Sequence, residues 1–409
     1  MNLVSGDLYW TNINRIPNKY TYLSEDVNYD VVIVGGGITG ALCAYYFAEA
    51  GIKVAVVEKN IIGYGSTSAS TSILQYEIDN NLIGLKGLVG LDNAVKAFKL
   101  CNKAVYDIEN IINNLDDKCD FILGQCLYYT NKTADIYMLE QEFELRKQYG
   151  FDVEFLDENT AKDKFSFPMK AAIYSRSGAA GINPYRFSHA LIDYAVKKGA
   201  VVYENTEITN TYSENDGEVL ITRNGFKIRA KKILVAQGFE ARKYVEKNVA
   251  KFTRSFTLVT KPIKDFNGWY NKCIIRDTNK MYTYLRITGD NRVMIGGEDL
   301  EVGGERSKVS NLCNEDSVAK EKYKILEDKL RNMFPNIKDI EIEYKFSGLF
   351  GETKDSLPYI GVYDDLPNYY FCMGYGSNGI IYNVIGAQLL RDLHLGKNPP
   401  ELNIFSFNR

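Results

Sequence analysis

The sequence predicts an α/β protein (α+β overall) in which a Rossmann-like dinucleotide-binding domain carries an inserted second domain with an antiparallel sheet. Residues 30–58 show the strand–glycine–helix–strand pattern that opens a Rossmann-like domain. Residues 93–115 then form a long amphipathic helix where a simple dinucleotide domain would continue to a third parallel strand. Residues 252–299 are rich in strand signals, which favours an antiparallel sheet.

The opening pattern divides into three elements. Val31–Val34 is a β-branched apolar run, short enough for a strand buried on both faces. Ile38–Ala50 is expected to be a helix that Gly51 terminates, and Val54–Val57 is a second buried strand. The uncharged stretch 31–48 also raises the possibility of a membrane span. Its three consecutive glycines and the β-branched residues before them argue against a continuous helix.

Three glycines in this stretch have the spacing G-x-G-x-x-G. Gly35 permits the tight turn, Gly37 lets the backbone approach a pyrophosphate, and Gly40 lets the helix pack closely on the strand. The amides at the helix N-terminus then face the pyrophosphate charge. Glu58 ends the second strand, where a carboxylate can accept hydrogen bonds from the ribose hydroxyls of an adenosine.

A dense run of small residues follows Glu58. Residues 63–72 contain two glycines and six serines or threonines, which can surround a phosphate or a sugar with amides and hydroxyls. The alternative is an ordinary solvated loop. The position of the run at the carboxyl end of the second strand, in the ligand crevice, favours the ligand-binding interpretation.

Length, charge and cysteine usage limit the class of protein. The chain of 409 residues is long enough for two domains or one large composite. It has 49 basic and 52 acidic residues and a net charge of −3, which predicts neither a nucleic-acid surface nor a polybasic membrane anchor. Residues 1–29 show no secretory signal. Seven scattered cysteines without a C-x-x-C pair predict no metal or disulfide framework and favour a reducing cytoplasm.

The first half of the chain contains further predicted elements. Residues 1–28 are expected to lie as an arm over the first domain. Asn93–Leu115 is the long amphipathic helix, with Asp92 as its expected cap. A strand over 121–129 and a helix over 134–149 follow. This block is interpreted as the start of a separate substrate domain.

The second half returns to an α/β pattern. A helix is predicted over Tyr185–Lys198, followed by a hairpin that turns at Asn224–Gly225 and by a buried strand over Lys232–Val235. After the strand-rich stretch, a helix is expected at 317–333. Near the C-terminus, the strand Tyr369–Met373 meets a glycine-rich segment and a helix, so a second set of backbone amides can face an electron-rich ligand atom.

Taken together, these motifs resemble the D-amino-acid oxidase (DAO) family of FAD-dependent oxidoreductases, which includes glycine, sarcosine and γ-glutamylputrescine oxidases. The resemblance covers roughly residues 20–405. It rests on five stretches: VVIVGGGITG with Glu58, IIGYGSTSAS, VAQG, the R-x-T-G-D-x-R-x-x-x-G-G segment from Arg286 to Gly297, and GETKDSLPYIG with GYGSNGI.

The resemblance implies a discontinuous architecture. An FAD-binding domain of the glutathione-reductase type would be assembled from residues 1–90, 170–245 and 344–409. A substrate-binding domain would be assembled from residues 91–169 and 246–343. FAD would bind tightly with its ring between the two domains.

The resemblance also assigns residues to FAD by position. They form the adenosine-diphosphate site, the second phosphate and ribityl loop, the contact to adenine, and the amides at the pyrimidine edge of the flavin. These residues are Gly35, Gly36, Gly37, Ile38, Thr39, Gly40, Glu58, Lys59, Gly65, Ser66, Thr67, Ser68, Ile208, Ala236, Gly238, Gly374, Gly376, Ser377, Asn378, Gly379 and Ile380.

The chain also departs from the family pattern. Ala69-Ser70-Thr71 stands where many members have Arg-Asn-Gly, and Gln237 replaces the more usual threonine. No residue stands at a family position for covalent flavin attachment. Non-covalent FAD is therefore expected.

The candidate substrate-binding residues lie mainly on the stretch MYTYLRI. Strand alternation places Tyr282, Tyr284 and Arg286 on one face, and an arginine binds a carboxylate through two hydrogen bonds. The resemblance puts this strand over the flavin. The alternative is a cross-strand ion pair with aromatic neighbours. Gln75 and Tyr76 are further candidates for the pocket that faces the ring.

Other polar residues are expected to be structural. His189 and His394 are the only histidines, and both are interpreted as structural or surface residues, which makes a hydrolase triad improbable. Lys261 is either a cation near the flavin or a solvated lysine. Hydride transfer from a neutral amine to a flavin needs no dedicated acid or base.

The predicted function is oxidation of the C–N bond of a small amine or amino acid to an imine. Oxidation of a hydroxy acid or glycerol phosphate, and a flavin-binding subunit without turnover, remain alternatives. An NAD-only dehydrogenase is less favoured because it leaves the GYGSNGI junction unexplained. The sequence identifies neither the substrate, nor the electron acceptor, nor the oligomeric state.

Overall fold

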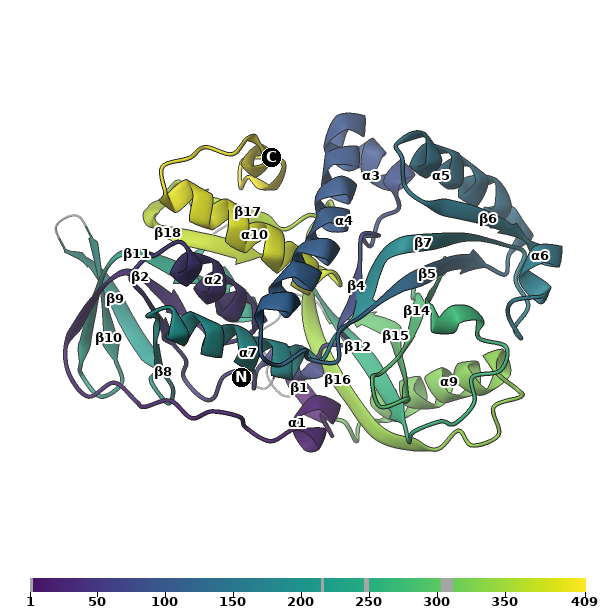
Figure 1. Cartoon of the computed structure of the whole chain (residues 1–409), viewed down its shortest axis with the longest axis horizontal. Helices are drawn as coiled ribbons and strands as arrows, with labels where there is room; N and C mark the ends of the chain where they lie inside the picture. Colours follow the sequence, from purple (N-terminus) through teal and green to yellow (C-terminus); the bar gives the residue numbers. More distant parts are fainter. Residues whose placement is uncertain (1–2, 215–216, 246–249, 303–311) are drawn as a thin grey trace.

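The protein consists of two lobes, each built on one sheet (Figure 1). A computed structural model describes residues 3–214, 217–245, 250–302 and 312–409. One sheet has eight strands and the other has ten. The long helix α4 (Leu91–Asn114) stands between the lobes.

The eight-stranded sheet has a parallel centre. Its main path is β17 (Tyr359–Tyr363), β18 (Leu366–Met373), β11 (Lys227–Val235), β2 (Val27–Val34), β3 (Val54–Val57) and β8 (Val201–Tyr203), and β10 (Gly217–Thr222) and β9 (Ile208–Glu214) continue from β11. Strands β18, β11, β2, β3 and β8 pair in parallel. Val31 and Ile33 face one hydrophobic cluster, and Val32 and Val34 face another. The strand is therefore buried on both faces, as its β-branched composition predicts.

Three helices cover one face of this sheet: α2 (Ile38–Glu49), α7 (Pro184–Lys197) and α10 (Gly379–His394) (Figure 1). The other face is covered in part by strand β10, whose Leu220 packs against Val32 and Val34 in the second cluster. The predicted α/β architecture is confirmed by this parallel core.

The ten-stranded sheet is mostly antiparallel. Its main path is β1 (Val4–Gly6), β16 (Ile342–Glu352), β12 (Lys251–Thr260), β15 (Val293–Glu301), β14 (Thr283–Ile287), β13 (Ile274–Asp277), β5 (Ile122–Thr130), β7 (Ala171–Gly181) and β4 (Ile73–Gln75), and β6 (Val153–Asp157) pairs with β7. The pair β13–β5 is parallel. Helix α9 (Ser317–Met333) packs on the ten-stranded sheet through Leu326 and Leu330. The other α-helices among the described residues are α1 (Tyr9–Ile13), α3 (Leu82–Val89), α5 (Ile136–Gln148) and α6 (Glu158–Lys162).

Two local predictions were wrong. Helix α4 begins at Leu91 with Gly90 as its cap, because α3 ends one residue earlier and Gly90 turns the chain with a φ of 81°. Asp92 lies in the first turn, where its charge favours the helix dipole but does not cap it. The strand expected over Lys232–Val235 is the continuation of the second hairpin strand, since β11 runs unbroken from Lys227.

The N-terminal arm lies over the first lobe only in part. Residues 20–23 hydrogen-bond to Glu204 and Thr206 of that lobe, as expected, but the start of the arm lies elsewhere. Strand β1 joins the edge of the ten-stranded sheet by pairing with β16. Tyr9 and Trp10 of α1 then pack with Phe346. The arm therefore binds the second lobe before the chain enters the first.

The domain boundaries remain a prediction, and strand pairing bears on them at four places. Strands β1, β4 and β7 and most of β16 fall within the ranges assigned to the FAD-binding domain, yet they hydrogen-bond into the ten-stranded sheet. The chain thus crosses between the sheets more often than five segments imply.

Two further searches cover the described part of the chain. None of its helices combines the length and apolar character that a bilayer crossing requires. No group of potential ligands there could hold a metal ion, and all seven cysteines are free.

His189 should make the fold acid-sensitive. It lies on α7 with its ring 4.6 Å from that of Tyr185, and burial lowers its pKa to about 4. In the unfolded chain the pKa of a histidine is about 6.5, so between these values the unfolded state binds more protons than the folded state. Stability should therefore fall as pH drops from about 6.5 to 4, by roughly 2 kcal/mol.

Urea unfolding of the wild type and of His189→Gln at several pH values tests this prediction. The difference between the two unfolding free energies should change across this window, because other titrating groups are common to both proteins. A difference that stays constant from pH 7 to pH 4 would contradict it.

Candidate active site

A cavity of about 1170 Å³ connects the two sheets. Its lining comes from the β2–α2 turn, the loop after β3, the Gly374–Ile380 junction and strands β12, β14 and β15. Sites for drug-sized ligands usually have volumes of about 300–1,000 Å³. The size and length of this cavity suit a dinucleotide together with a small substrate.

The β2–α2 turn forms one end of the cavity, and its glycines are required by close backbone contacts. Gly35 has a φ of 115°, and a Cβ there would clash with the carbonyl of Ala236. A Cβ at Gly40 would clash with the carbonyl of Gly35. The amide of Ile38 donates to Thr67 Oγ1 over 2.9 Å, which ties the small-residue loop to the start of α2. The turn is therefore shaped to bring backbone amides close to a phosphate.

Glu58 closes the same turn from the next strand. Its Oε2 accepts from the amide of Gly36 over 2.7 Å, and its Oε1 accepts from the amide of Asn60 over 2.8 Å. Burial raises its pKa, and the two amide hydrogen bonds oppose that shift. The carboxylate is thus held at the cavity wall, where a ribose can reach it.

The second glycine junction lies further along the cavity. Gly374 and Gly376 have positive φ values of 74° and 58°. The amide of Gly376 donates to the carbonyl of Gly351, and the amide of Ser377 donates to Asp79 Oδ2 over 3.1 Å. Both these amides already have partners inside the protein.

The ten-stranded sheet forms the wall opposite the turn. Tyr282, Tyr284 and Gln75 line the cavity, as the sequence predicts. The Tyr282 hydroxyl donates to Asp79 Oδ1 over 3.2 Å, and the Tyr284 hydroxyl shares a hydrogen bond with Ser255 Oγ over 3.1 Å. The cavity thus joins a dinucleotide-shaped turn to a wall of polar and aromatic side chains.

Comparison with known proteins decides the family. The sequence profile of the DAO family, described as FAD dependent oxidoreductase, matches residues 30–393. The chain belongs to this DAO family. It binds FAD, as the family description states.

Individual relatives are distant but cover nearly the whole chain. The γ-glutamylputrescine oxidoreductase of Escherichia coli (strain K12) is 28% identical over 397 residues, which cover 93% of this chain and 87% of the relative. The glycine oxidase of Geobacillus kaustophilus (strain HTA426) is 24% identical over 392 residues, which cover 89% of this chain and 92% of the relative.

Solved structures share the fold. The crystal structure of glycine oxidase from Geobacillus kaustophilus has a TM-score of 0.76 at 21% identity and covers 93% of this chain and 99% of its own. The L-amino acid deaminase from Proteus vulgaris has a TM-score of 0.78 at 15% identity and covers 97% of this chain and 100% of its own.

The residues that the sequence assigned to FAD in this DAO protein are gathered at the cavity. Eighteen of the 21 line it: Gly35, Gly37, Ile38, Thr39, Glu58, Lys59, Gly65, Ser66, Thr67, Ile208, Ala236, Gly238, Gly374, Gly376, Ser377, Asn378, Gly379 and Ile380. The other three support the lining. Gly36 donates to Glu58, Gly40 allows α2 to approach β2, and Ser68 Oγ donates to the carbonyl of Gly65 over 2.8 Å.

Arg286 is placed differently from the expectation. Its guanidinium donates to the carbonyl of Ser72 over 2.7 Å and to the carbonyl of Ile182 over 3.0 Å, and it lies 5.4 Å from the ring of Trp10. The side chain is buried and does not line the cavity. Tyr282 and Tyr284, which were predicted on the same face, line the cavity. Around Arg286, however, the N-terminal helix α1 and two carbonyl groups occupy the space.

Tyr76 and Lys261 also lie outside the cavity lining. The Tyr76 ring stacks on Phe151 at 4.8 Å, and its hydroxyl shares a hydrogen bond of 2.9 Å with Ser175. Lys261 is exposed and pairs with Glu341. The solvated-lysine interpretation of Lys261 therefore holds.

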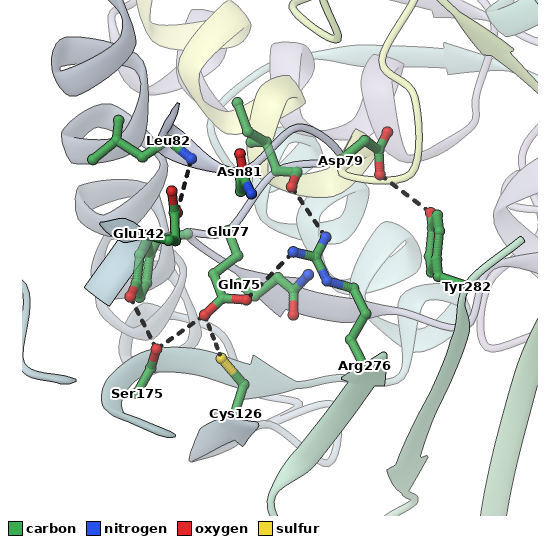
Figure 2. A network of polar contacts seen from close by, with 12 residues as sticks. Gln75, Glu77, Asp79, Asn81, Leu82, Cys126, Glu142, Ser175, Arg276 and Tyr282 are labelled. Atoms are coloured by element: carbon green, nitrogen blue, oxygen red, sulfur yellow. Dashed lines mark hydrogen bonds and ion pairs between the residues drawn. The ribbon is translucent and has the colours of Figure 1, made fainter. Parts of the chain in front are cut away.

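A buried ionic network is centred on Glu77, two residues after Gln75 (Figure 2). Arg146 of α5 contacts Glu77 over 2.5 Å and Glu142 over 2.7 Å. Arg276 Nη2 lies 3.6 Å from Glu77, and its Nη1 donates to the carbonyl of Ile78 over 3.0 Å. Burial alone would raise the pKa of Glu77, but the two arginines hold it below its ordinary value. Two cations and two anions balance each other here.

The cavity residues that sequence reasoning missed include Arg276 and Asp299. Arg276 lies on β13 and is paired in register with Tyr284, so strand alternation could have placed it on the same face. Asp299 could not be placed in this way, because Tyr284 is paired with Gly296 and regular alternation would put residue 299 on the opposite face of β15. An irregularity at Gly297 and Glu298, both with positive φ, turns Asp299 towards the cavity.

Gly40→Ala should weaken FAD binding. The added methyl group would push α2 away from the carbonyl of Gly35, and such overpacking typically costs about 1–3 kcal/mol. We expect the dissociation constant for FAD to rise by roughly tenfold to a hundredfold. Gly87→Ala in α3 is the control, because no atom lies within 4 Å of its added Cβ. Equal FAD affinity of the two variants would show that the turn tolerates a side chain.

Arg146→Met should destabilise the fold strongly. It leaves Glu77 and Glu142 buried without their main cation, and breaking a buried pair in this way costs about 3–5 kcal/mol. Urea unfolding of the FAD-loaded protein measures the effect. Arg176→Met is the matched control, since its pairs with Asp152 and Glu154 are exposed and should contribute nothing measurable. Similar losses in both variants would argue against the network's importance.

Proposed function

We propose that this DAO-family protein oxidises the C–N bond of a small amine or amino acid to an imine, which water then hydrolyses. The observation that carries the proposal is the single cavity that runs from the glycine turn at Gly35 to the side chains of β14 and β15. Bound FAD supplies the hydride acceptor. The protein residues bind the substrate, orient it and exclude water.

The side chains around the cavity suit this chemistry. Hydride transfer from a neutral amine needs no dedicated base. Neither His189 nor His394 lines the cavity, so no histidine is positioned for acid–base catalysis among its lining residues. Relatives named for glycine and for γ-glutamylputrescine support an amine as the donor.

Arg276 is the proposed anchor for a substrate carboxylate. It lines the cavity, and its Nε is buried without a hydrogen-bond partner, whereas Nη2 lies 3.6 Å from Glu77 and Nη1 donates to the carbonyl of Ile78. Arg286, in contrast, already donates to two carbonyls and does not line the cavity. A guanidinium at the cavity wall with a free Nε–H donor suits a carboxylate.

The alternative substrates have weaker support. A glycerol 3-phosphate oxidase of Mycoplasma genitalium is 23% identical but matches only 52% of this chain. A phosphate carries more charge than a carboxylate and would favour several basic residues beside Tyr282 and Tyr284, yet among the lining residues of β13, β14 and β15 only Arg276 is basic. A flavin-binding subunit without turnover would leave the substrate wall without a role.

We also propose a cytoplasmic protein that acts on a small molecule rather than on nucleic acid. Its seven free cysteines, of which six are buried, support a reducing compartment. The balanced charge supports a small-molecule partner. Binding through the glycine turn, without a covalent bond, is proposed for FAD.

The visible spectrum of the pure protein, recorded before and after anaerobic addition of candidate donors, tests the function. Glycine, sarcosine, D-amino acids, L-proline and polyamines form the panel. We expect a yellow protein that one class of amine bleaches. Arg276→Lys should then weaken reduction by carboxylate-bearing donors about tenfold, because a lysine loses the bidentate geometry.

Other outcomes separate the alternatives. Bleaching by a hydroxy acid or by glycerol phosphate, and by no amine, would overturn the proposal of C–N oxidation. A yellow protein that no donor reduces would support the subunit. A colourless protein that cannot be loaded with FAD would contradict the assignment of the cavity.

A further inference from the structure

One carboxylate on the substrate wall has an oxygen atom without a partner. Asp299 on β15 lines the cavity together with Ser255 and Thr257 of β12 and with Tyr282 and Tyr284 of the β14 side. Its Oδ1 is buried and makes no hydrogen bond with the described residues. A buried carboxylate oxygen without a partner is costly, so such groups in cavities are candidates for ligand contacts.

The charges around Asp299 are negative. The pKa of Asp299 is raised to about 7, mainly by burial. The hydrogen bond from Ser255 lowers this pKa, and the carboxylates of Glu352, Asp79 and Glu298 contribute to raising it. Lys322 and Lys329 lie nearby but pair with Glu298.

No ion pair joins Asp299 to a cation anywhere in the described ranges. Tyr282 and Tyr284 are the other titrating groups that face it, and both are neutral at physiological pH because burial raises their pKa further. When it is ionised, the Asp299 carboxylate therefore has no cation of its own among the described residues.

The opposite part of the wall is electrically balanced. Arg276 projects from β13, and β14 separates it from β15. The network of Arg146, Arg276, Glu77 and Glu142 contains equal numbers of positive and negative groups. Figure 2 shows three of them, Arg276, Glu77 and Glu142. A ligand group that neutralises the substrate wall is therefore a cation, and it would bind beside Asp299.

Two aromatic rings complete this part of the wall. The centroids of Tyr282 and Tyr284 lie 5.8 Å apart, with an angle of 47° between the ring planes. Their hydroxyls already bond to Asp79 and Ser255, so the rings are fixed in place. Aromatic faces next to a carboxylate form a typical binding site for an ammonium group.

We propose that Asp299, together with Tyr282 and Tyr284, binds the amino group of the substrate in its positively charged form. The ammonium group then gives one proton to the Asp299 carboxylate, because only the neutral amine can transfer a hydride. The inference rests on the proposed function, because it names the group of an amine donor that the wall recognises. Asp299 thereby selects donors that carry an alkylammonium group, while Arg276 on the other side of β14 accepts a carboxylate where the donor has one. Asp299 is a specificity-determining residue in this scheme.

The test uses tetramethylammonium chloride as a cationic probe without an N–H bond. Calorimetric titration of the FAD-loaded wild type should show binding that strengthens as pH rises through about 7, when Asp299 ionises. Asp299→Asn should weaken binding about tenfold or more and remove the pH dependence. Asp299→Glu keeps the charge and should retain binding, which guards against a folding artefact in the asparagine variant.

Glu301→Gln is the matched control. Glu301 lies two residues further on the same strand, is exposed and pairs with Lys251, so its loss should leave probe binding unchanged. Equal binding by Asp299→Asn and the wild type, or absence of binding in the wild type, would overturn the inference. Asp299-dependent probe binding in a protein that no amine reduces would support the inference and count against the proposed oxidation. Reduction of the flavin by an amine to the same extent in Asp299→Asn and the wild type would count against the inference and support the proposed oxidation.

Discussion

The buried contact between Arg146 and Glu77 fixes the geometry of the active site. Arg146 comes from α5, and Glu77 lies just after β4, so the pair joins a surface helix to the segment that runs along the cavity. Gln75 precedes this anchor and Asp79 follows it. Because the ions are fully buried, neither can move without leaving the other unpaired. This keeps Gln75 in the cavity wall and keeps Asp79 in place to accept from Tyr282.

The FAD half of the site could be predicted from the sequence because local rules determine it. A turn that places Gly40 against the carbonyl of Gly35 tolerates only glycine at that position. An acidic residue at the end of the next strand lies at a fixed distance from this turn, so its carboxylate can contact it. Such constraints act between residues that are close in the chain. They therefore appear in the sequence as a recognisable spacing of residues.

The substrate half could be predicted only in part, because contacts between distant segments decide it. Strand alternation correctly placed Tyr282 and Tyr284 on the cavity wall. It could not reveal that Trp10 and the carbonyl of Ser72 surround Arg286, since both come from the far N-terminal side of the chain. The position of Tyr76 could not be predicted for the same reason, because contacts with Phe151 and Ser175 hold this residue in the core.

The position of β1 has a consequence for how the protein is made. This strand emerges from the ribosome long before its partner β16, because the strands β2 to β15 lie between them in the sequence. Until β16 is made, Tyr9 and Trp10 lack the contact with Phe346 that buries them. The edge of the second lobe therefore cannot form before β16 is synthesised, and β1 stays unpaired while the strands between them are added.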